Sequence, residues 1–189
     1  MIVVAFDPGK LASWALFDTS RPQSMRMGEV ELIGSGRLLR PCPIHITEII
    51  SCADSVIVEE VGARPKQGVS SMFTFGLAVG TILGTVSAHQ KQIELVAPTD
   101  WKKSSKLGGL SGVDAKRAAL ARAKELWPEH HETFRKEANH GQADAALMAR
   151  WYFLDGPGRA IELAEDSAIA RDAAPAPRKA SRKTSKVAA

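Results

Sequence analysis

Apolar runs separated by turn residues dominate the first hundred positions and indicate β-strands. The first run ends at the turn Asp7-Pro8-Gly9-Lys10, across which the second run can pair as a hairpin. The fourth run is almost wholly apolar, as is typical of a central strand covered on both faces. The expected strands are residues 2–6, 12–18, 27–33, 55–60 and 92–96.

Helical patterns lie between and after these runs. A helical turn is expected from Pro98, and an amphipathic helix ends before Pro128. The longer expected helices are residues 43–53, 69–90, 113–127 and 140–154. This order predicts an α/β fold with a mixed five-stranded sheet, in which three antiparallel strands are followed by two parallel strands, with helices on both faces.

The segment 69–90 is unusual because residues 72–88 carry no charge. Those 17 residues fall just short of the ~18 that would suggest a membrane span. Gly76, Gly80 and Gly84 are four apart and so lie along one helical face. We therefore expect a buried helix that packs closely on a sheet or a partner, and no membrane association.

The length of the chain allows one folded domain. With 189 residues, 44% of them hydrophobic, the chain can bury one core. We expect that domain at 1–157 and, at 158–189, a short helical extension and a disordered basic tail. Residues 171–189 carry a net charge of +5 and residues 1–170 a net charge of −1, so the basicity belongs largely to the tail. Such a tail is either a solubilising end or a flexible arm that binds phosphates.

The cysteines and the N-terminus both favour an intracellular location. Cys42 and Cys52 match neither a zinc-binding nor a redox spacing. No basic-then-apolar leader precedes the first strand, so a secretory signal is not expected.

Acidic residues end two of the predicted strands. Asp7 closes the first strand and Glu59-Glu60 close the fourth. If these strands are neighbours, the two carboxylates can hold hard divalent cations, which prefer oxygen ligands. Strand alternation sends Glu59 and Glu60 to opposite faces, so only one of them can face such a site. Asp144 and, one helical turn earlier, His140 share a face of the last helix.

Each of these residues also has a structural interpretation. Asp7 before Pro-Gly suits a turn without any metal. Asp144 can be an exposed helix residue, although its small apolar neighbours indicate a partly buried position. His140 can be a neighbour of the helix N-cap beside Asn139.

Four motifs, in this order and spacing over residues 1–155, resemble RuvC-type Holliday junction resolvases of the RNase H-like superfamily, most of all the compact versions of phages and prophages. The motifs are Phe6-Asp7-Pro8-Gly9, Ile57-Val58-Glu59-Glu60-Val61, Pro98-Thr99-Asp100-Trp101-Lys102-Lys103 and His140-Gly141-Gln142-Ala143-Asp144-Ala145.

The resemblance implies an RNase H-like fold and a homodimer that hydrolyses phosphodiesters at four-way DNA junctions. Such an enzyme leaves 5′-phosphate and 3′-hydroxyl ends, acts in the cytoplasm of a bacterial or phage-infected cell, and uses no nucleotide cofactor. By alignment, Glu59 rather than Glu60 joins Asp7, Asp144 and His140 as catalytic and metal-binding residues. Asp7 would bridge two Mg²⁺ ions, for which Mn²⁺ can substitute.

Basic residues between 62 and 124 outnumber acids by ten to three and are candidates for phosphate contact. The candidates for DNA binding are Arg64, Lys66, Lys102, Lys103, Lys106, Lys116 and Arg117. An aromatic residue that follows the fourth-strand glutamate in well-known bacterial members is absent from residues 61–67. We therefore expect a substrate range broader than perfect four-way junctions.

Three alternatives, of unequal weight, remain at this point. An RNase H-like nuclease could act on flap DNA or precursor ribosomal RNA with the same residues. The opening Asp-Pro-Gly also resembles the first phosphate loop of actin-like and sugar-kinase ATPases, but these need two such domains and 189 residues are too few. A nucleic-acid-binding module without catalysis is less favoured, because all the expected acids are present.

Overall fold

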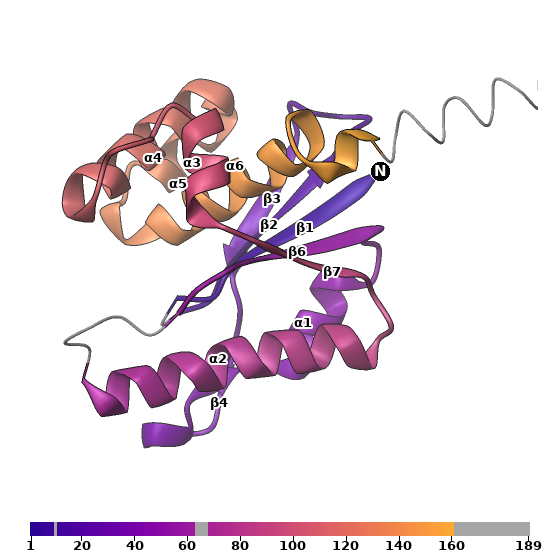
Figure 1. Ribbon diagram of the computed structural model, residues 1–189, viewed down its shortest axis with the longest axis vertical. Helices are drawn as coiled ribbons and strands as arrows, with labels where there is room; N and C mark the ends of the chain where they lie inside the picture. The colour runs from indigo at the N-terminus through magenta and orange to yellow at the C-terminus, as the bar shows by residue number, and fades with distance from the viewer. Residues whose placement is uncertain (10, 63–67, 161–189) are drawn as a thin grey trace, which may run out of the picture.

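A mixed five-stranded sheet forms the centre of the computed structural model, which describes residues 1–9, 11–62 and 68–160 (Figure 1). The strand order is β3-β2-β1-β6-β7. A separate ribbon pairs β4 with β5. The strands are β1 (Ile2–Asp7), β2 (Ser13–Asp18), β3 (Met25–Glu29), β4 (Leu32–Ile33), β5 (Arg40–Pro41), β6 (Ser55–Glu59) and β7 (Ile93–Val96).

The pairing of the strands follows from their turns and connections. The tight turn after Asp7 makes β1 and β2 antiparallel, with Asp7 opposite Ser13, and β3 continues the meander. The helical crossovers make β6 parallel to β1 and β7 parallel to β6. The sheet of three antiparallel and two parallel strands that the sequence predicts is therefore confirmed.

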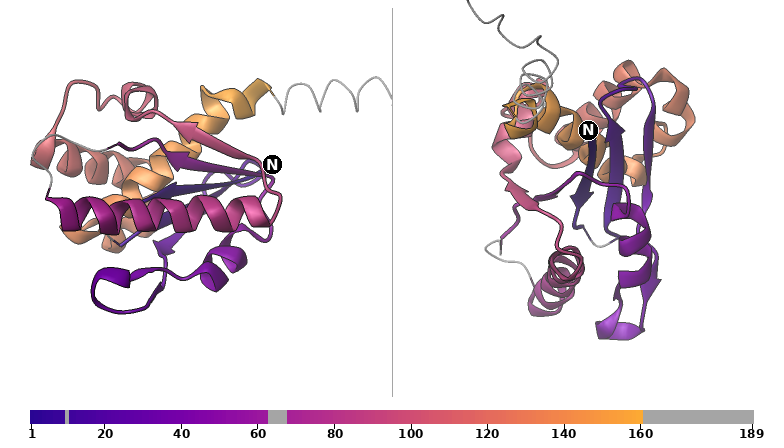
Figure 2. Two further views of the ribbon diagram at one scale, coloured as in Figure 1. Left: turned by 60° about the horizontal axis from the view of Figure 1, so that its bottom comes forward. Right: turned by 90° about the vertical axis from the view of Figure 1, so that its right-hand side faces the viewer.

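Helices cover both faces of the sheet (Figures 1 and 2). Helices α1 and α2 lie on one side and α3 to α6 on the other, and each side has its own core of buried apolar residues. The α-helices are α1 (Pro43–Ile50), α2 (Val69–Ala88), α3 (Pro98–Ser104), α4 (Gly112–Leu126), α5 (His131–Phe134) and α6 (His140–Leu154), with 3₁₀ turns at Gly36–Leu38, Pro128–His130 and Glu137–Asn139.

The third predicted strand is wrong in its extent. Strand β3 ends at Glu29, and the backbone N–H of Val30 then donates to the carbonyl of Ala12. The next residues leave the sheet and pair in the β4–β5 ribbon. The alternating pattern continues through both strands, so it does not reveal the break between them.

The expected helix at 69–90 is present as α2, but within the described chain it is not closely packed and buried on the sheet, and packing on a partner stays a prediction. Helix α2 buries only Ala78, Ile82 and Val86. Added Cβ atoms on its three glycines at 76, 80 and 84 would meet nothing within 4 Å. The apolar composition of α2 did not indicate that only a narrow face of the helix is buried. By length and composition alone, α2 is long and apolar enough to cross a membrane.

Candidate active site

Three acidic side chains meet in a pocket at the carboxyl edge of the central strands. Asp7 ends β1, Glu59 ends β6, and Asp144 projects from α6, which crosses this part of the sheet. The pocket has a volume of about 370 Å³. Its lining is Asp7, Glu59, Lys102, Leu107, Leu110, Ser111, Gly112, Ala115, Lys116 and Asp144.

The fold brings these acids together for simple reasons. Strands β1 and β6 are parallel neighbours, so their carboxyl ends lie at the same edge of the sheet. The next residue of that edge, Glu60, is exposed and does not line the pocket. Helix α6 is rich in alanine and buried on most of its circumference, which lets Asp144 approach the strands.

Asp7, His140 and Asp144 each offer one possible ligand atom, and these atoms all lie within 4.8 Å of one another. His140 begins α6 one turn before Asp144, so both side chains lie on the helical face above Asp7. Glu59 lines the same pocket and raises the pKa of both aspartates. The four residues that the sequence singles out are therefore neighbours in space.

Burial and repulsion between the acids both disfavour the ionised forms of the two aspartates in the pocket. Burial, followed by the nearby Glu59 carboxylate, raises the pKa of Asp7 to about 7, although a backbone N–H of Gly9 and two lysines, Lys102 and Lys116, oppose the shift. Burial, then Asp7 and Glu59, also raises the pKa of Asp144 well above its usual value. A bound cation would relieve this repulsion and favour the ionised carboxylates.

His140 is suited to act as a neutral base or ligand. Burial, and then the charge of Lys116, lowers the pKa of its imidazole. Its Nδ1 atom is buried and has no hydrogen-bond partner among the described residues. A buried polar atom without a partner is costly unless something in the working protein satisfies it. Together with three carboxylates, it fits a site for a hard divalent cation of the Mg²⁺ or Mn²⁺ type.

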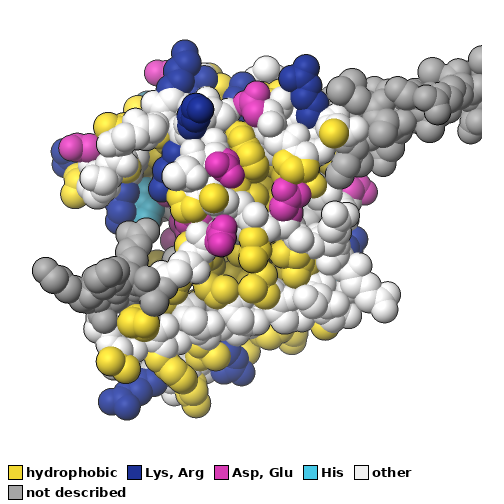
Figure 3. All heavy atoms as spheres, viewed as in Figure 1, with side chains coloured by type: hydrophobic (Ala, Val, Ile, Leu, Met, Phe, Trp, Pro, Cys, Tyr) yellow, Lys and Arg dark blue, Asp and Glu magenta, His cyan; other side chains and the backbone are white. Residues whose placement is uncertain are grey.

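The predicted DNA-binding residues divide into three groups. Lys102 and Lys116 line the pocket. Lys103 and Lys106 are exposed on and just after α3, and Arg117 pairs with Glu137 at 3.1 Å beside an adjoining cavity. Arg64 and Lys66 lie outside the described residues. In the space-filling view, basic side chains gather over the end of this face that carries α3 and α4 (Figure 3).

Two residues near the acids were given no role by the sequence. The indole of Trp101 reaches Glu59, and Gly141 lies against Asp7. Both lie in the sequence motifs given above. A glycine in the first turn of an alanine-rich helix indicates a close contact at that position, because glycine otherwise disfavours helices.

Comparison with known proteins places this site in a familiar fold. No family model matches the sequence. A curated relative, the chloroplastic Holliday junction resolvase MOC1 of Chlamydomonas reinhardtii, is 32% identical over 94 residues, which cover 50% of this chain and 10% of the relative. The chain thus matches about a tenth of the length of that relative.

Two solved structures of RuvC from Thermus thermophilus are similar over 80% of this chain. The first has a TM-score of 0.53 at 15% identity and is covered to 95%. The second, in complex with Holliday junction substrate, has a TM-score of 0.57 at 16% identity and is covered to 94%. These likenesses bear out the resemblance seen in the sequence and show that the chain has the RuvC-type, RNase H-like fold.

Proposed function

We propose that the protein is a divalent-metal-dependent endonuclease that resolves four-way DNA junctions. The observation that carries the proposal is the meeting of Asp7, Glu59, Asp144 and His140 at one edge of a RuvC-type sheet. The similarity to a curated junction resolvase supports the choice of substrate.

The acids would hold the metal and His140 would handle a proton or complete the site. Asp7, Glu59 and Asp144 supply the oxygen ligands that two Mg²⁺ or Mn²⁺ ions prefer. When bound, such ions activate a water and stabilise the leaving 3′ oxygen. His140 is held neutral, so one ring nitrogen can accept either a cation or a proton of the attacking water.

The basic residues would hold the DNA. Lys102 and Lys116 flank the acids in the pocket and suit the phosphate that is cut. Lys103, Lys106 and Arg117 would contact phosphates farther along the strand, without reading sequence. For Arg64, Lys66 and the basic tail, phosphate contact stays a proposal from the sequence, as does action in the cytoplasm.

The proposed homodimer would form through α2. This helix carries no charged residue, and its exposed face includes Val69 and Phe73, which are 84% and 55% exposed. Exposed apolar area of this kind marks interaction surfaces. Open space at Gly76 and Gly80 would let a second helix approach closely.

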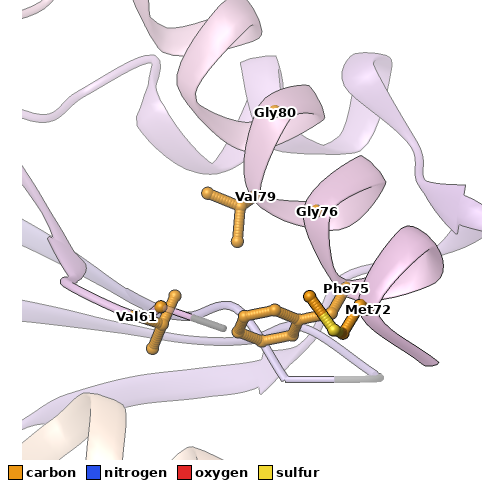
Figure 4. Close-up of a pocket in the computed structure, with 7 residues that line it drawn as sticks. Val61, Met72, Phe75, Gly76, Val79 and Gly80 are labelled. Carbon is orange, nitrogen blue, oxygen red and sulfur yellow. The ribbon is translucent and has the colours of Figure 1, made fainter. Parts of the chain in front are cut away.

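A neighbouring apolar pocket supports the same surface. Met72, Phe75 and Val79 extend from α2 towards Val61, which follows β6, and enclose about 340 Å³ with the helix glycines (Figure 4). A side chain from a partner's α2 could enter this pocket. Because Val61 follows Glu59 by two residues, the dimer contact would lie close to the candidate active site.

The test is cleavage of labelled four-way junctions in Mg²⁺, compared with duplex, single-stranded DNA, flap DNA and an RNA–DNA hybrid. We expect paired nicks in the junction and much slower cutting of duplex. Preferential cutting of flap DNA or of precursor ribosomal RNA would instead support the alternative RNase H-like activities. Junction cutting no faster than duplex cutting would refute the proposal.

A further inference from the structure

Trp101 connects the hydrophobic core to the candidate active site. It is the fourth residue of α3, and its side chain is fully buried in the core beneath α4 and α6. Its indole Nε1 nevertheless donates a hydrogen bond to Oε1 of Glu59 at 3.2 Å. The hydrogen bond therefore joins a rigid core residue to an acid of the pocket.

The topology explains how two residues 42 positions apart meet. Glu59, the last residue of β6, lies opposite Val96, the last residue of the parallel strand β7. A single residue, Ala97, separates β7 from α3, which Pro98 starts. The first turn of α3 therefore carries Trp101 directly to the side of Glu59.

We propose that Trp101 is a positioning residue, whose indole holds the Glu59 carboxylate in the orientation that binds the divalent cation. This inference rests on the proposed function. An indole N–H is only a donor and does not titrate, so it always presents the same partner to the carboxylate. Loss of a residue that orients a metal ligand typically lowers metal affinity or activity by roughly 10- to 100-fold.

The same ring also meets a base of the pocket. The Nζ atom of Lys102 lies 5.0 Å from the centre of the Trp101 ring, within the range of a cation–π contact. Lys102 lines the pocket together with Glu59. The edge of the indole thus positions the Glu59 carboxylate, and its face positions the Lys102 ammonium group. The Trp101 ring therefore sets the distance between these two charges in the pocket.

Two matched variants test the role of the indole. Trp101→Phe keeps an aromatic ring in the core and removes the N–H group. Trp127→Phe is the control, because Trp127 is also buried, and its Nε1 donates to a backbone carbonyl, that of Pro22, outside the pocket. Isothermal titration calorimetry with Mn²⁺ on the full-length protein, without DNA, measures metal affinity directly.

We expect Trp101→Phe to weaken Mn²⁺ binding about 10-fold, at the lower end of the range for residues that support metal ligands. The same variant should need about 10-fold more Mg²⁺ for half-maximal junction cleavage, whereas Trp127→Phe should change neither value. Unchanged Mn²⁺ affinity in a folded Trp101→Phe protein overturns the inference and leaves the proposed nuclease intact. A wild-type protein that binds no Mn²⁺ overturns both.

A measurement on the wild-type chain guards against a variant that does not fold. The indole ¹⁵N–¹H signal of Trp101 should shift as Mg²⁺ is added, because its acceptor becomes a metal ligand. The indole signal of Trp127 should stay in place. A Trp101 signal that does not move at saturating Mg²⁺ would show that the Trp101 indole does not hold a carboxylate that binds the metal.

Discussion

Gly141 and Asp7 are in such close contact that a Cβ atom added at Gly141 would lie 3.0 Å from Oδ2 of Asp7. The same atom would lie 2.6 Å from Oγ of Ser13, the strand partner of Asp7. Cβ atoms rarely approach other atoms so closely, so a larger residue at 141 requires Ser13, Asp7 or α6 itself to shift. The distance between Asp144 and Asp7 depends on this contact.

Gly141→Ala should abolish cleavage, because it pushes α6, with His140 and Asp144, away from Asp7. Overpacking of this kind costs about 1–3 kcal/mol, so the variant should still fold. Urea unfolding measures the loss of stability, and junction cleavage measures the loss of activity.

A second variant separates the contact of that methyl group with the Ser13 hydroxyl from its contact with Asp7. Gly141→Ala with Ser13→Ala removes the clash with Oγ of Ser13 but leaves the contacts with Oδ2 of Asp7 and, at 3.2 Å, with the Cβ atom of residue 13. Stability should recover in part while cleavage stays lost. Full activity in Gly141→Ala alone would show that α6 moves without disturbing the site.

Several features of the fold followed from the sequence because they depend on local patterns. The bounds of α6, residues 140–154, are as predicted, and the parallel placement of β1 and β6 follows from the order of the elements. Contacts such as those of Trp101 and Gly141 did not follow, because they join residues far apart in the chain. The exposure of α2 did not follow either, since an apolar sequence does not state which of its faces is covered.

The ionisation of Asp7 should make the metal-free protein less stable as the pH rises. Its pKa is about 7 in the folded protein against 3.8 as its ordinary value. The folded state therefore holds a proton that the unfolded state has lost, so this contribution to stability is present at pH 4 and is lost as the pH rises through about 7. Three pKa units correspond to about 4 kcal/mol, which access of water to the pocket reduces to about 2 kcal/mol.

Asp7→Asn removes this effect and provides the test. In EDTA at pH 8 the variant should be more stable than wild type by about 2 kcal/mol, and at pH 4 the difference should vanish. Adding Mg²⁺ should stabilise wild type far more than the variant. Asp7→Asn should also bind junctions without cutting them, since binding rests on basic residues. A wild type that is as stable as Asp7→Asn in EDTA at pH 8 would contradict the prediction.

Phe73→Asp should dissociate the proposed dimer, because it places a charge on the exposed apolar face of α2. Light scattering after gel filtration should show a monomer, and a monomer should lose the paired nicks in a junction. Ile44→Asp is the control, since Ile44 is also an exposed apolar residue, 72% exposed, but lies on α1. A Phe73→Asp protein that remains dimeric would place the dimer contact elsewhere.

Lys106 sits in a backbone conformation that favours glycine, with a φ of 63°. It ends α3 with two hydrogen bonds that close the helix, from its own N–H to the carbonyl of Lys103 at 3.1 Å and from Leu107 N–H to the carbonyl of Lys102 at 2.7 Å. Lys106→Gly should therefore stabilise the protein by about 1 kcal/mol. Lys103→Gly, within α3 itself, should destabilise it by about 1 kcal/mol.

This pair of variants also tests the DNA contacts, because each removes one positive charge while stability moves in opposite directions. If both lysines contact phosphates, each variant should bind junctions more weakly and reduce the slope of log affinity against log salt by about 1. Fluorescence anisotropy at several salt concentrations measures that slope. If Lys106→Gly leaves the slope unchanged while Lys103→Gly reduces it, the lysine at this strained position has no role in binding. A reduced slope for Lys106→Gly would show that Lys106 contacts a DNA phosphate despite its strained backbone.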